Sequence, residues 1–370
     1  MWKRLCSGAL ACALLSCPAA AGAVEAGPPV SAASAILVDG SSGRVLYEKD
    51  AHQERLIAST TKLMTALVAL ESGHRLDEVV TIAPEWTGAE GSSLYLRPGE
   101  EVTLEALLYG LLLRSGNDAA LAVAGHCGGT VEDFVTLMNR KARELGMEQS
   151  AFANPNGLNA EGHYSTAYDM ALLARACLKN QALVEIASTK SITFGTRSFT
   201  NHNKLLWQYE GCIGLKTGYT EKAGRTLVSA AERDGLTLIC VTLNAPNDWV
   251  DHAKLFDYGF SRFAPEVVSE AGELLGRLPV AGSLLPACPV AAGEGLTVAL
   301  APGEELEISC VLDEGPLPAP VERCMRVGEL VCSLQGCELA RIPLVTAVKI
   351  PENKASQGNF LDRLWRGLAG

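Results

Sequence analysis

The order of hydrophobic patterns along the chain limits the possible folds more than any other feature of the sequence. Residues 34–50 (SAILVDGSSGRVLYEKD) hold two short β-like runs around a Gly/Ser turn, which predicts a hairpin. Over residues 59–179 the apolar spacing is mostly helical, and β-like runs return after Gly214. Two of the later runs meet at Asp234-Gly235, a strong hairpin signal. The pattern predicts an α+β fold, in which helices cover the faces of an antiparallel sheet.

The composition changes at about residue 264. Residues 264–350 are rich in Pro, Gly, Val and Leu and show short β-like pieces without helical periodicity, which predicts a small all-β domain. Residues 351–370 are expected to be a linker and a tail. The segment 358–370 is expected either to lie in a membrane interface or to be a frayed end. Its apolar residues fall on one helical face: Phe360, Leu361, Leu364, Trp365 and Leu368.

The N-terminus resembles a secretory signal peptide. Lys3 and Arg4 precede an apolar run that ends at Cys17 and is too short to span a bilayer. We expect a signal peptide over residues 1–23, with cleavage after Ala26 as the alternative, and export of the remainder. The first domain of the remainder is then expected over 24–263.

Net charge limits the classes of partner that the protein can bind, and cysteine spacing limits the metal sites and disulfides that it can form. The net charge of −11 falls to about −13 once the two cations of the signal are removed, and so acidic a chain excludes nucleic acid as a partner. Nine cysteines lie beyond the signal, without a Cys-x-x-Cys pair or zinc-like Cys/His spacing. Free thiols are the favoured interpretation, and a disulfide within 310–337 is the alternative.

Ser59 and Lys62 form the first candidate site. Serine is a common helix cap, but its usual partner three residues later is Glu or Gln, and a lysine there faces the positive end of the helix dipole. Burial at a helix start lowers the pKa of a lysine, and a neutral lysine can take the proton of a hydroxyl on the same face. The pair therefore predicts a nucleophile and its base, although Ser-x-x-Lys alone is common.

Two further clusters are unremarkable in isolation. Ser115-Gly116-Asn117 stands between two helical stretches, and Lys216-Thr217-Gly218, followed by Tyr219, stands on a predicted strand. The three motifs together, in this order, form the set of serine β-lactamases and penicillin-binding proteins.

The resemblance extends beyond the motifs. The stretches LLLRSGNDAALAVAG, FANPNGLNAEGHYSTAYDMALLARA and GLKTGYTEKAGRTLVSAA closely resemble exported serine-type D-alanyl-D-alanine carboxypeptidases, the low-molecular-mass penicillin-binding proteins. The resemblance covers about residues 34–263. It implies a β-lactamase/transpeptidase-like catalytic domain, and 264–350 looks like the C-terminal domain of that family.

The same resemblance implies residue roles. Ser59 would be acylated, Lys62 would be its base, and Ser115 would relay the proton to the departing D-alanine. Asn117 would hold both the peptide amide and Lys62. The oxyanion would lie between backbone amides, one from Ser59 and one from Tyr219.

The third motif would bind the substrate terminus. Lys216 would supply positive potential and Thr217 a hydroxyl for the terminal carboxylate, while Gly218 would let another backbone approach. The expected partners are peptidoglycan stem peptides ending in D-Ala-D-Ala and β-lactam antibiotics. No cofactor and no metal are expected, because side chains alone supply this chemistry.

Two positions depart from the family pattern. Ile57 stands where many members have proline. Some members use an arginine after the last core strand, where this chain has Asp248-Trp249.

The three remaining alternatives for the function are a β-lactamase, a DD-endopeptidase and a non-catalytic peptidoglycan-binding protein. Asn154 and Asn156 are interpreted as turn formers, and a final set of residues is interpreted as structural: His163, His202 and His252.

Overall fold

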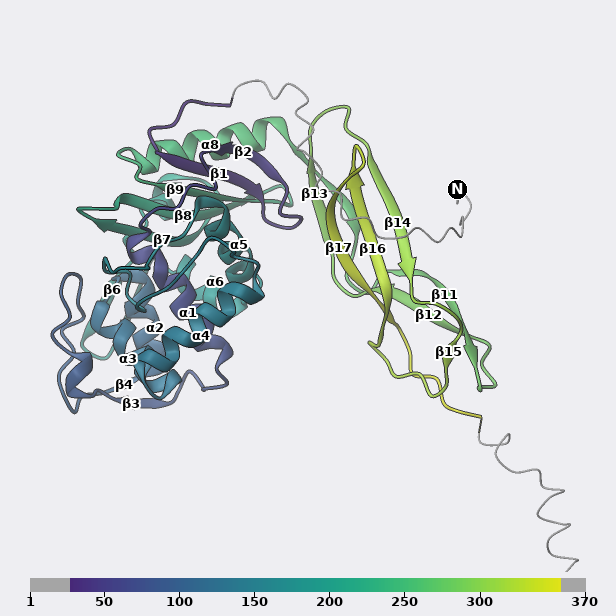
Figure 1. Cartoon of the computed structure of the whole chain (residues 1–370), viewed down its shortest axis with the longest axis horizontal. Helices are drawn as coiled ribbons and strands as arrows, with labels where there is room; N and C mark the ends of the chain where they lie inside the picture. The colour runs from purple at the N-terminus through teal and green to yellow at the C-terminus, as the bar shows by residue number, and fades with distance from the viewer. Residues whose placement is uncertain (1–26, 354–370) are drawn as a thin grey trace, which may run out of the picture.

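The protein forms two units that follow one another along the chain (Figure 1). The structure is a computed structural model that describes residues 27–353. The N-terminal unit (27–263) ends with helix α8 (Asp248–Arg262), and the β unit (264–353) begins with strand β10 (Ala264–Ser269). The signal peptide predicted over 1–23 and the tail segment 358–370 lie outside the described residues.

A five-stranded antiparallel sheet organises the N-terminal unit, in the order β2-β1-β9-β8-β7. Its strands are β1 (Ser34–Asp39), β2 (Val45–Lys49), β7 (Cys212–Thr220), β8 (Gly224–Arg233) and β9 (Leu236–Leu243). Both predicted hairpins are present, β1–β2 and β8–β9. The second turns at Asp234 and Gly235, whose φ angles of 47° and 80° suit the tight turn predicted from Asp-Gly.

Alternation along the strands separates the two faces of the sheet. In β9, Ile239 and Val241 belong to the core shared with the helical insert, whereas Leu238 and Cys240 pack on the other face. Helix α8 covers this second face with Leu255 and Phe256. The α+β prediction is therefore correct, with one helix on one face and the helical insert on the other (Figure 1).

The helical insert joins β2 to β7. Its main helices are α1 (Lys62–Glu71), α2 (Leu104–Leu113), α3 (Asn117–Gly128), α4 (Val131–Glu144), α5 (Ala167–Leu178) and α6 (Gln181–Ser188). Its smaller elements are η1 (Ala58–Thr61), β3 (Val79–Thr81), η2 (Pro84–Trp86), β4 (Glu101–Thr103), β5 (Ser191–Phe194), β6 (Arg197–Thr200) and α7 (Leu205–Gln208). Every residue of α1 from Lys62 to Ala69 is buried, so the first lysine of this helix lies inside the protein.

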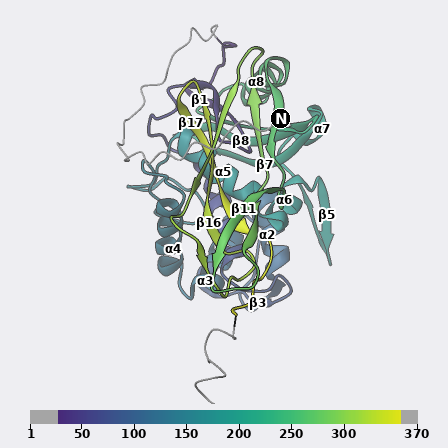
Figure 2. The same cartoon turned by 90° about the vertical axis from the view of Figure 1, so that its right-hand side faces the viewer.

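The β unit is all-β, as its composition predicts. Strand β10 pairs with β13, and the other six strands form a sheet in the order β14-β16-β17-β12-β11-β15. Strand β13 spans Leu296–Leu300, and the six strands of the larger sheet are β11 (Leu274–Ala281), β12 (Ala287–Ala292), β14 (Leu306–Leu312), β15 (Leu317–Pro318), β16 (Arg326–Leu334) and β17 (Cys337–Thr346). Figure 2 looks onto this unit and shows its long strands lying in front of the N-terminal unit.

A small set of polar contacts joins the units. Arg44, after β1, forms an ion pair with Glu304 at 2.6 Å and also donates to the Ala299 carbonyl at 2.6 Å. The Asp39 carboxylate accepts from the Ala299 amide at 3.0 Å. These contacts fix the β unit against the sheet edge that carries the first hairpin.

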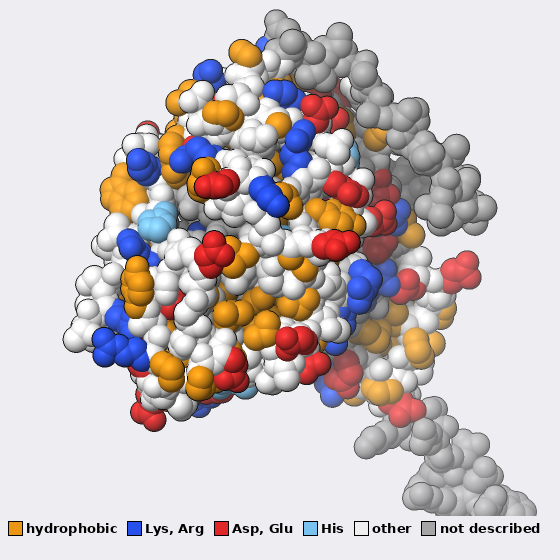
Figure 3. Space-filling model, turned by 60° about the vertical axis from the view of Figure 1, so that its left-hand side comes forward, with side chains coloured by type: hydrophobic (Ala, Val, Ile, Leu, Met, Phe, Trp, Pro, Cys, Tyr) orange, Lys and Arg blue, Asp and Glu red, His pale blue; other side chains and the backbone are white. Residues whose placement is uncertain are grey.

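The structure also shows the distribution of surface charge on one face and the state of the described cysteines. Acidic and basic side chains are intermixed on the face drawn in Figure 3, without a continuous basic stripe. None of the helices within 27–353 is both long and apolar enough to cross a membrane. The described cysteines are thiols, and several are core residues: Cys177, Cys240, Cys288 and Cys332.

Candidate active site

Ser59 lies on a short 3-10 turn directly before α1. The sequence suggests an ordinary helix start, but η1 spans Ala58–Thr61 and α1 begins at Lys62. Side chains three residues apart eclipse one another in a 3-10 turn, and the Lys62 Nζ lies 3.0 Å from the Ser59 Oγ. Ala58 has a left-handed backbone with φ 48°, a conformation that non-glycine residues adopt mainly where surrounding structure holds them.

Lys62 is completely buried and surrounded by acceptors. Its Nζ donates to the Asn117 Oδ1 at 2.7 Å and to the Asn156 backbone carbonyl at 2.5 Å. Burial lowers the pKa of this lysine well below its ordinary value, and the charge of Lys216 lowers it further. A lysine with so depressed a pKa can hold a free lone pair toward the Ser59 hydroxyl, as the sequence predicts.

The second motif forms the turn between α2 and α3. Ser115 has φ 62°, a second left-handed non-glycine residue, and Asn117 begins α3. The Asn117 side chain donates to the Glu90 carbonyl at 2.5 Å while its oxygen accepts from Lys62. Ser115 and Asn117 are therefore held in place by both the turn geometry and the loop before α2.

Asp118 positions that loop and was not identified from the sequence. Its carboxylate accepts from the Ser93 hydroxyl at 2.7 Å and from the Leu94 and Leu96 amides at about 3.0 Å. The side chain is buried, so these bonds satisfy a charge that water does not reach. An acidic residue directly after the Ser-Gly-Asn motif was the available signal.

Lys216, Thr217 and Gly218 lie on β7, the edge strand of the sheet. Lys216 is 1% exposed, its Nζ donates to the Thr217 carbonyl at 3.0 Å, and burial lowers its pKa to about 7. A Cβ on Gly218 would lie 2.9 Å from the Ser59 amide nitrogen. The glycine therefore allows β7 to pass directly beside the nucleophile turn, as its place in the motif predicts.

The three motifs meet at a cavity of about 470 Å³, which we call the site cavity. Lys62, Asn117 and Lys216 are buried close to it. The lining residues are Ser59, Ser92, Ser115, Asn201, His202, Lys204, Thr217, Gly218, Tyr219, Arg225, Asp248 and Trp249. The structure thus brings the predicted catalytic serines together with Thr217, Gly218 and Tyr219 on one surface.

An arginine reaches the site cavity from a position that the sequence analysis did not consider. The stretch after the last core strand holds no arginine at the expected place, but Arg225 lies on β8, opposite Tyr219 of β7. It is ion-paired with the buried carboxylate of Asp248 at 2.9 Å and lies over the Trp249 ring at 5.4 Å. Strand register, which the sequence does not give directly, places it there.

The three histidines differ in their surroundings. His163 contacts the Thr61 hydroxyl at 2.8 Å, accepts from the Ala153 amide and has a pKa lowered to about 4 by burial. His252 lies between two buried strand hydroxyls, and burial lowers its pKa to about 3. Both fit the structural interpretation. His202 differs from both, because it is exposed and lines the site cavity.

Asn154 and Asn156 form a turn, and Asn156 also contacts Lys62. The side chains of Asn154 and Asn156 accept from the amides of Gly157 and Leu158, respectively, as turn formers do. The Asn156 carbonyl also accepts from Lys62. No local pattern indicates this contact, because it depends on a backbone oxygen 94 residues from the lysine.

Comparisons with known proteins identify the family of this chain. Residues 21–247 match the sequence model of the D-alanyl-D-alanine carboxypeptidase family. The chain belongs to that family. It is 32% identical over 349 residues to the D-alanyl-D-alanine carboxypeptidase DacF of Bacillus subtilis, covering 90% of this chain and 88% of DacF.

Solved structures extend the comparison to the fold. Penicillin-binding protein 5 of Haemophilus influenzae superposes with a TM-score of 0.71 at 29% identity, covering 88% of this chain and 99% of that protein. A variant of the DD-transpeptidase of Streptomyces K15 has a TM-score of 0.61 at 34% identity, covering 63% of this chain and 99% of that one. The Streptomyces enzyme therefore matches only part of this chain, whereas the Haemophilus protein matches most of it.

Proposed function

We propose that this protein is a serine DD-carboxypeptidase that removes the terminal D-alanine from peptidoglycan stem pentapeptides through an acyl-enzyme on Ser59. One observation carries the proposal. The Nζ of a fully buried lysine lies 3.0 Å from the Ser59 hydroxyl, at the edge of a cavity large enough for a peptide end. Membership of the family agrees with this activity.

Acylation follows from the positions of four residues. Lys62 takes the proton of the Ser59 hydroxyl, and the Ser59 oxygen attacks the carbonyl of the penultimate D-alanine. The oxyanion is held by the backbone amides of Ser59 and Tyr219, an arrangement supported by the close approach of β7 to the nucleophile turn. Ser115 passes a proton to the departing amine, and water then hydrolyses the ester.

Substrate recognition combines an edge strand with positive charge. Strand β7 is the edge of the sheet, so an extended peptide can lie beside it as a further strand. Asn117 holds the peptide amide and orients Lys62, with which it is hydrogen bonded. Lys216 and the Thr217 hydroxyl bind the terminal carboxylate, and Arg225 adds a second positive charge from β8.

The alternatives differ in measurable products. A β-lactamase needs a base that activates water for rapid deacylation. Among the described residues that line the site cavity, the one carboxylate is Asp248, and Arg225 neutralises it. This supports slow release of penicillin. Incubation with a stem pentapeptide, a cross-linked muropeptide and penicillin, followed by mass spectrometry, separates the cases. Release of free D-alanine would support the carboxypeptidase, and cleavage of cross-links would support an endopeptidase. Rapid turnover of penicillin would support a β-lactamase, and the absence of acylation would support a non-catalytic binding protein.

Binding of the substrate carboxylate has its own test. Lys216→Ala should impair peptides with a free C-terminal carboxylate at least about tenfold more than their C-terminal amides, because only the former carry the charge it binds. Arg225→Ala should show the same selectivity at a smaller size, since Asp248 already offsets the charge of Arg225. Equal losses on acids and amides would show that these residues act on the chemistry instead.

The expected location is the outer face of the cytoplasmic membrane or the space beyond it. Export is supported by the signal-like residues 1–23, and peripheral membrane contact by the apolar face within 358–370. Deleting 352–370 should leave pentapeptide hydrolysis unchanged and move the protein from membrane to soluble fractions. A mature protein that does not sediment with anionic liposomes at low salt would show that the segment is only a tail.

A further inference from the structure

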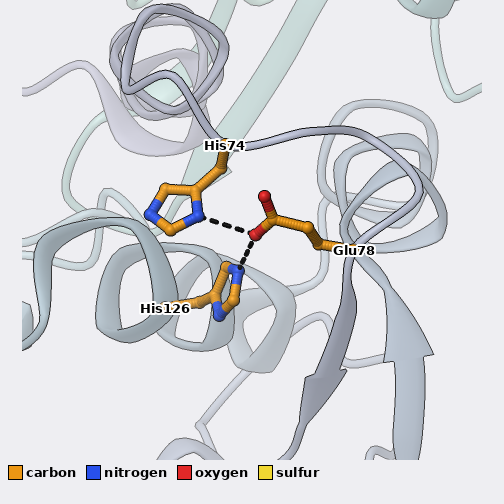
Figure 4. A group of neighbouring side chains, drawn as sticks. All are labelled: His74, Glu78 and His126. Atoms are coloured by element: carbon orange, nitrogen blue, oxygen red, sulfur yellow. Dashed lines mark hydrogen bonds and ion pairs between the residues drawn. The ribbon is translucent and has the colours of Figure 1, made fainter.

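Two histidines and a glutamate meet on the N-terminal unit outside the site cavity (Figure 4). His74 follows α1, Glu78 directly precedes β3, and His126 lies in the last turn of α3. The Glu78 Oε2 lies 2.7 Å from the His74 Nδ1 and 3.1 Å from the His126 Nε2. Three potential ligand atoms from three segments therefore point at one another, all within 4.8 Å.

The carboxylate between the imidazoles is held in place by its partners. The Glu78 Oε1 accepts from the Arg75 amide at 2.8 Å, which leaves Oε2 directed at the histidines. The side chains are between 22% and 34% exposed, so an ion and its water ligands can reach them.

We propose that His74, Glu78 and His126 form a binding site for a divalent transition metal ion of the zinc class. Two imidazoles and a carboxylate are the ligand set of a zinc site with one position left for water, whereas Ca²⁺ and Mg²⁺ prefer oxygen ligands alone. Zinc bonds of roughly 2.1 Å place tetrahedral ligand atoms about 3.4 Å apart. The separations of 2.7 and 3.1 Å reach this value through small side-chain rotations.

The ion would join two helices that carry the proposed active site. His74 lies just beyond the C-terminal end of α1, and His126 lies near the C-terminal end of α3. At their other ends the same helices carry Lys62 and Asn117, which are hydrogen bonded at 2.7 Å. The bound ion is therefore a structural clip on the α1–α3 pair. It takes no part in the reaction, and the site stands whether or not the proposed activity is correct.

The sequence did not predict this site. His74 and Glu78 are four residues apart, but His126 is 48 residues beyond Glu78, and no Cys/His spacing of a zinc motif is present. Only the packing of α3 against the segment that leads from α1 to β3 brings the third ligand into place. The expectation that catalysis needs no metal is unaffected.

Metal binding can be measured on the tag-free mature protein after treatment with a chelator. Calorimetric titration with Zn²⁺, and native mass spectrometry, should show one equivalent that His126→Gln weakens at least about tenfold and His74→Ala/His126→Gln removes. Affinity should fall as the pH is lowered, because protons compete for the imidazole nitrogens. Mg²⁺ should not compete.

Two control variants separate this site from other zinc ligands. His52→Ala removes an exposed histidine that lies 3.9 Å from Glu48 in a pair without a third ligand, and it should leave binding unchanged. Cys127→Ser removes the thiol next to His126 and should also leave binding unchanged. Zinc binding that persists in the His74/His126 double variant, or that depends equally on His52 or Cys127, overturns the proposal.

The clip is tested by thermal unfolding. With Zn²⁺ about a hundredfold above its Kd, the Tm of the wild-type protein should rise by about 5 °C, and that of the double variant by less than about 1 °C. Covalent labelling by fluorescent penicillin gives a check that the variants are folded. Stoichiometric binding without a wild-type rise in Tm would overturn the structural role.

Discussion

The N-terminal unit and the β unit bury different kinds of side chain. The N-terminal unit encloses two lysines and several carboxylates, among them Lys62, Lys216 and Asp118. Among the described residues of the β unit, the buried polar side chains are Ser269 and Thr346, neither of which is charged. Burial of charge is unfavourable unless partners or a function maintain it. The buried charges therefore place the chemistry in the N-terminal unit, whereas the core of the β unit serves packing.

The two units also differ in the side chains that their edge strands expose. The edge strand β7 of the N-terminal unit runs beside the nucleophile and lines the site cavity with Thr217 and Tyr219. In the β unit, edge strand β14 exposes Ile308, Val311 and Leu312 without a comparable set of polar groups. If this division holds, function depends on the first unit and stability is shared by both.

The largest effects are expected at the nucleophile and the buried lysine beside it. Lys62→Arg should lower the rate of acylation by penicillin about 10²–10⁴-fold, because guanidinium does not give up its proton and cannot act as a base. Ser59→Ala should abolish covalent labelling. Stopped-flow measurement with a fluorescent penicillin gives both results. Near wild-type acylation by the arginine variant would rule out Lys62 as the base, and labelling that survives Ser59→Ala would rule out Ser59 as the nucleophile.

A core substitution in the β unit should affect stability without affecting chemistry. Leu344, on β17, is 1% exposed and belongs to the core of that unit. Leu344→Ala should lower the free energy of unfolding of the β unit by about 2–4 kcal/mol through loss of buried contacts and the cavity that remains.

Denaturant unfolding measures this loss, and penicillin labelling at the same temperature should stay within about twofold of wild type. A matched substitution in the N-terminal unit, Leu67→Ala in α1, serves as the control. Leu67 is also 1% exposed, but it lies on the helix that begins with Lys62, so its loss should affect labelling as well. A large loss of labelling in Leu344→Ala would break the division between the units.

The pH dependence of kcat/KM should reflect the ionisation of both Lys62 and Lys216. Lys62 acts in its neutral form, so kcat/KM should rise as the pH rises through its lowered pKa. Lys216 binds the substrate as a cation with a pKa of about 7, so binding of the carboxylate should weaken as the pH rises above that value. The expected profile is bell-shaped for peptide acids. For C-terminal amides the alkaline limb should be lost, and its persistence would contradict the assignment to Lys216.

The same shifts set the sign of the stability change with pH. Both lysines have lower pKa values folded than the value near 10.4 expected in the unfolded chain. For Lys216 the unfolded state therefore binds more protons between about pH 7 and pH 10, so its contribution to stability rises over that window and is lost as the pH falls. The lowered pKa of Lys62 contributes with the same sign. Lys216→Met should remove its part of this dependence, which denaturant unfolding at several pH values can measure.

The smallest effect is expected where the two units meet. Arg44→Ala removes the pair with Glu304 and the bond to the Ala299 carbonyl, and it should cost about 1 kcal/mol, since the pair is only partly shielded from water. Glu304→Gln should give a similar or smaller loss. Penicillin labelling should not change in either variant. A change in labelling would show that the position of the β unit influences the site cavity.

The sequence contained enough to predict the fold class and to nominate most of the site. Hydrophobic periodicity is a local property, so it identified the first hairpin, the helical insert and the Asp234-Gly235 turn. The three motifs are also local, and each supplies a residue type whose chemistry is readable from the letters. Ser59 and Lys62, three residues apart, could be paired without knowledge of any other part of the chain.

The tertiary structure determined the pKa values, orientations and neighbours of those residues. The pKa of Lys62 depends on complete burial and on Lys216, and its orientation depends on Asn117 and the Asn156 carbonyl. Strand register placed Arg225 at the site cavity, and helix packing brought His126 to Glu78. Burial, register and long-range proximity are properties of the packed chain. Local patterns in the sequence identify the groups that take part, and the fold fixes their distances and their charges.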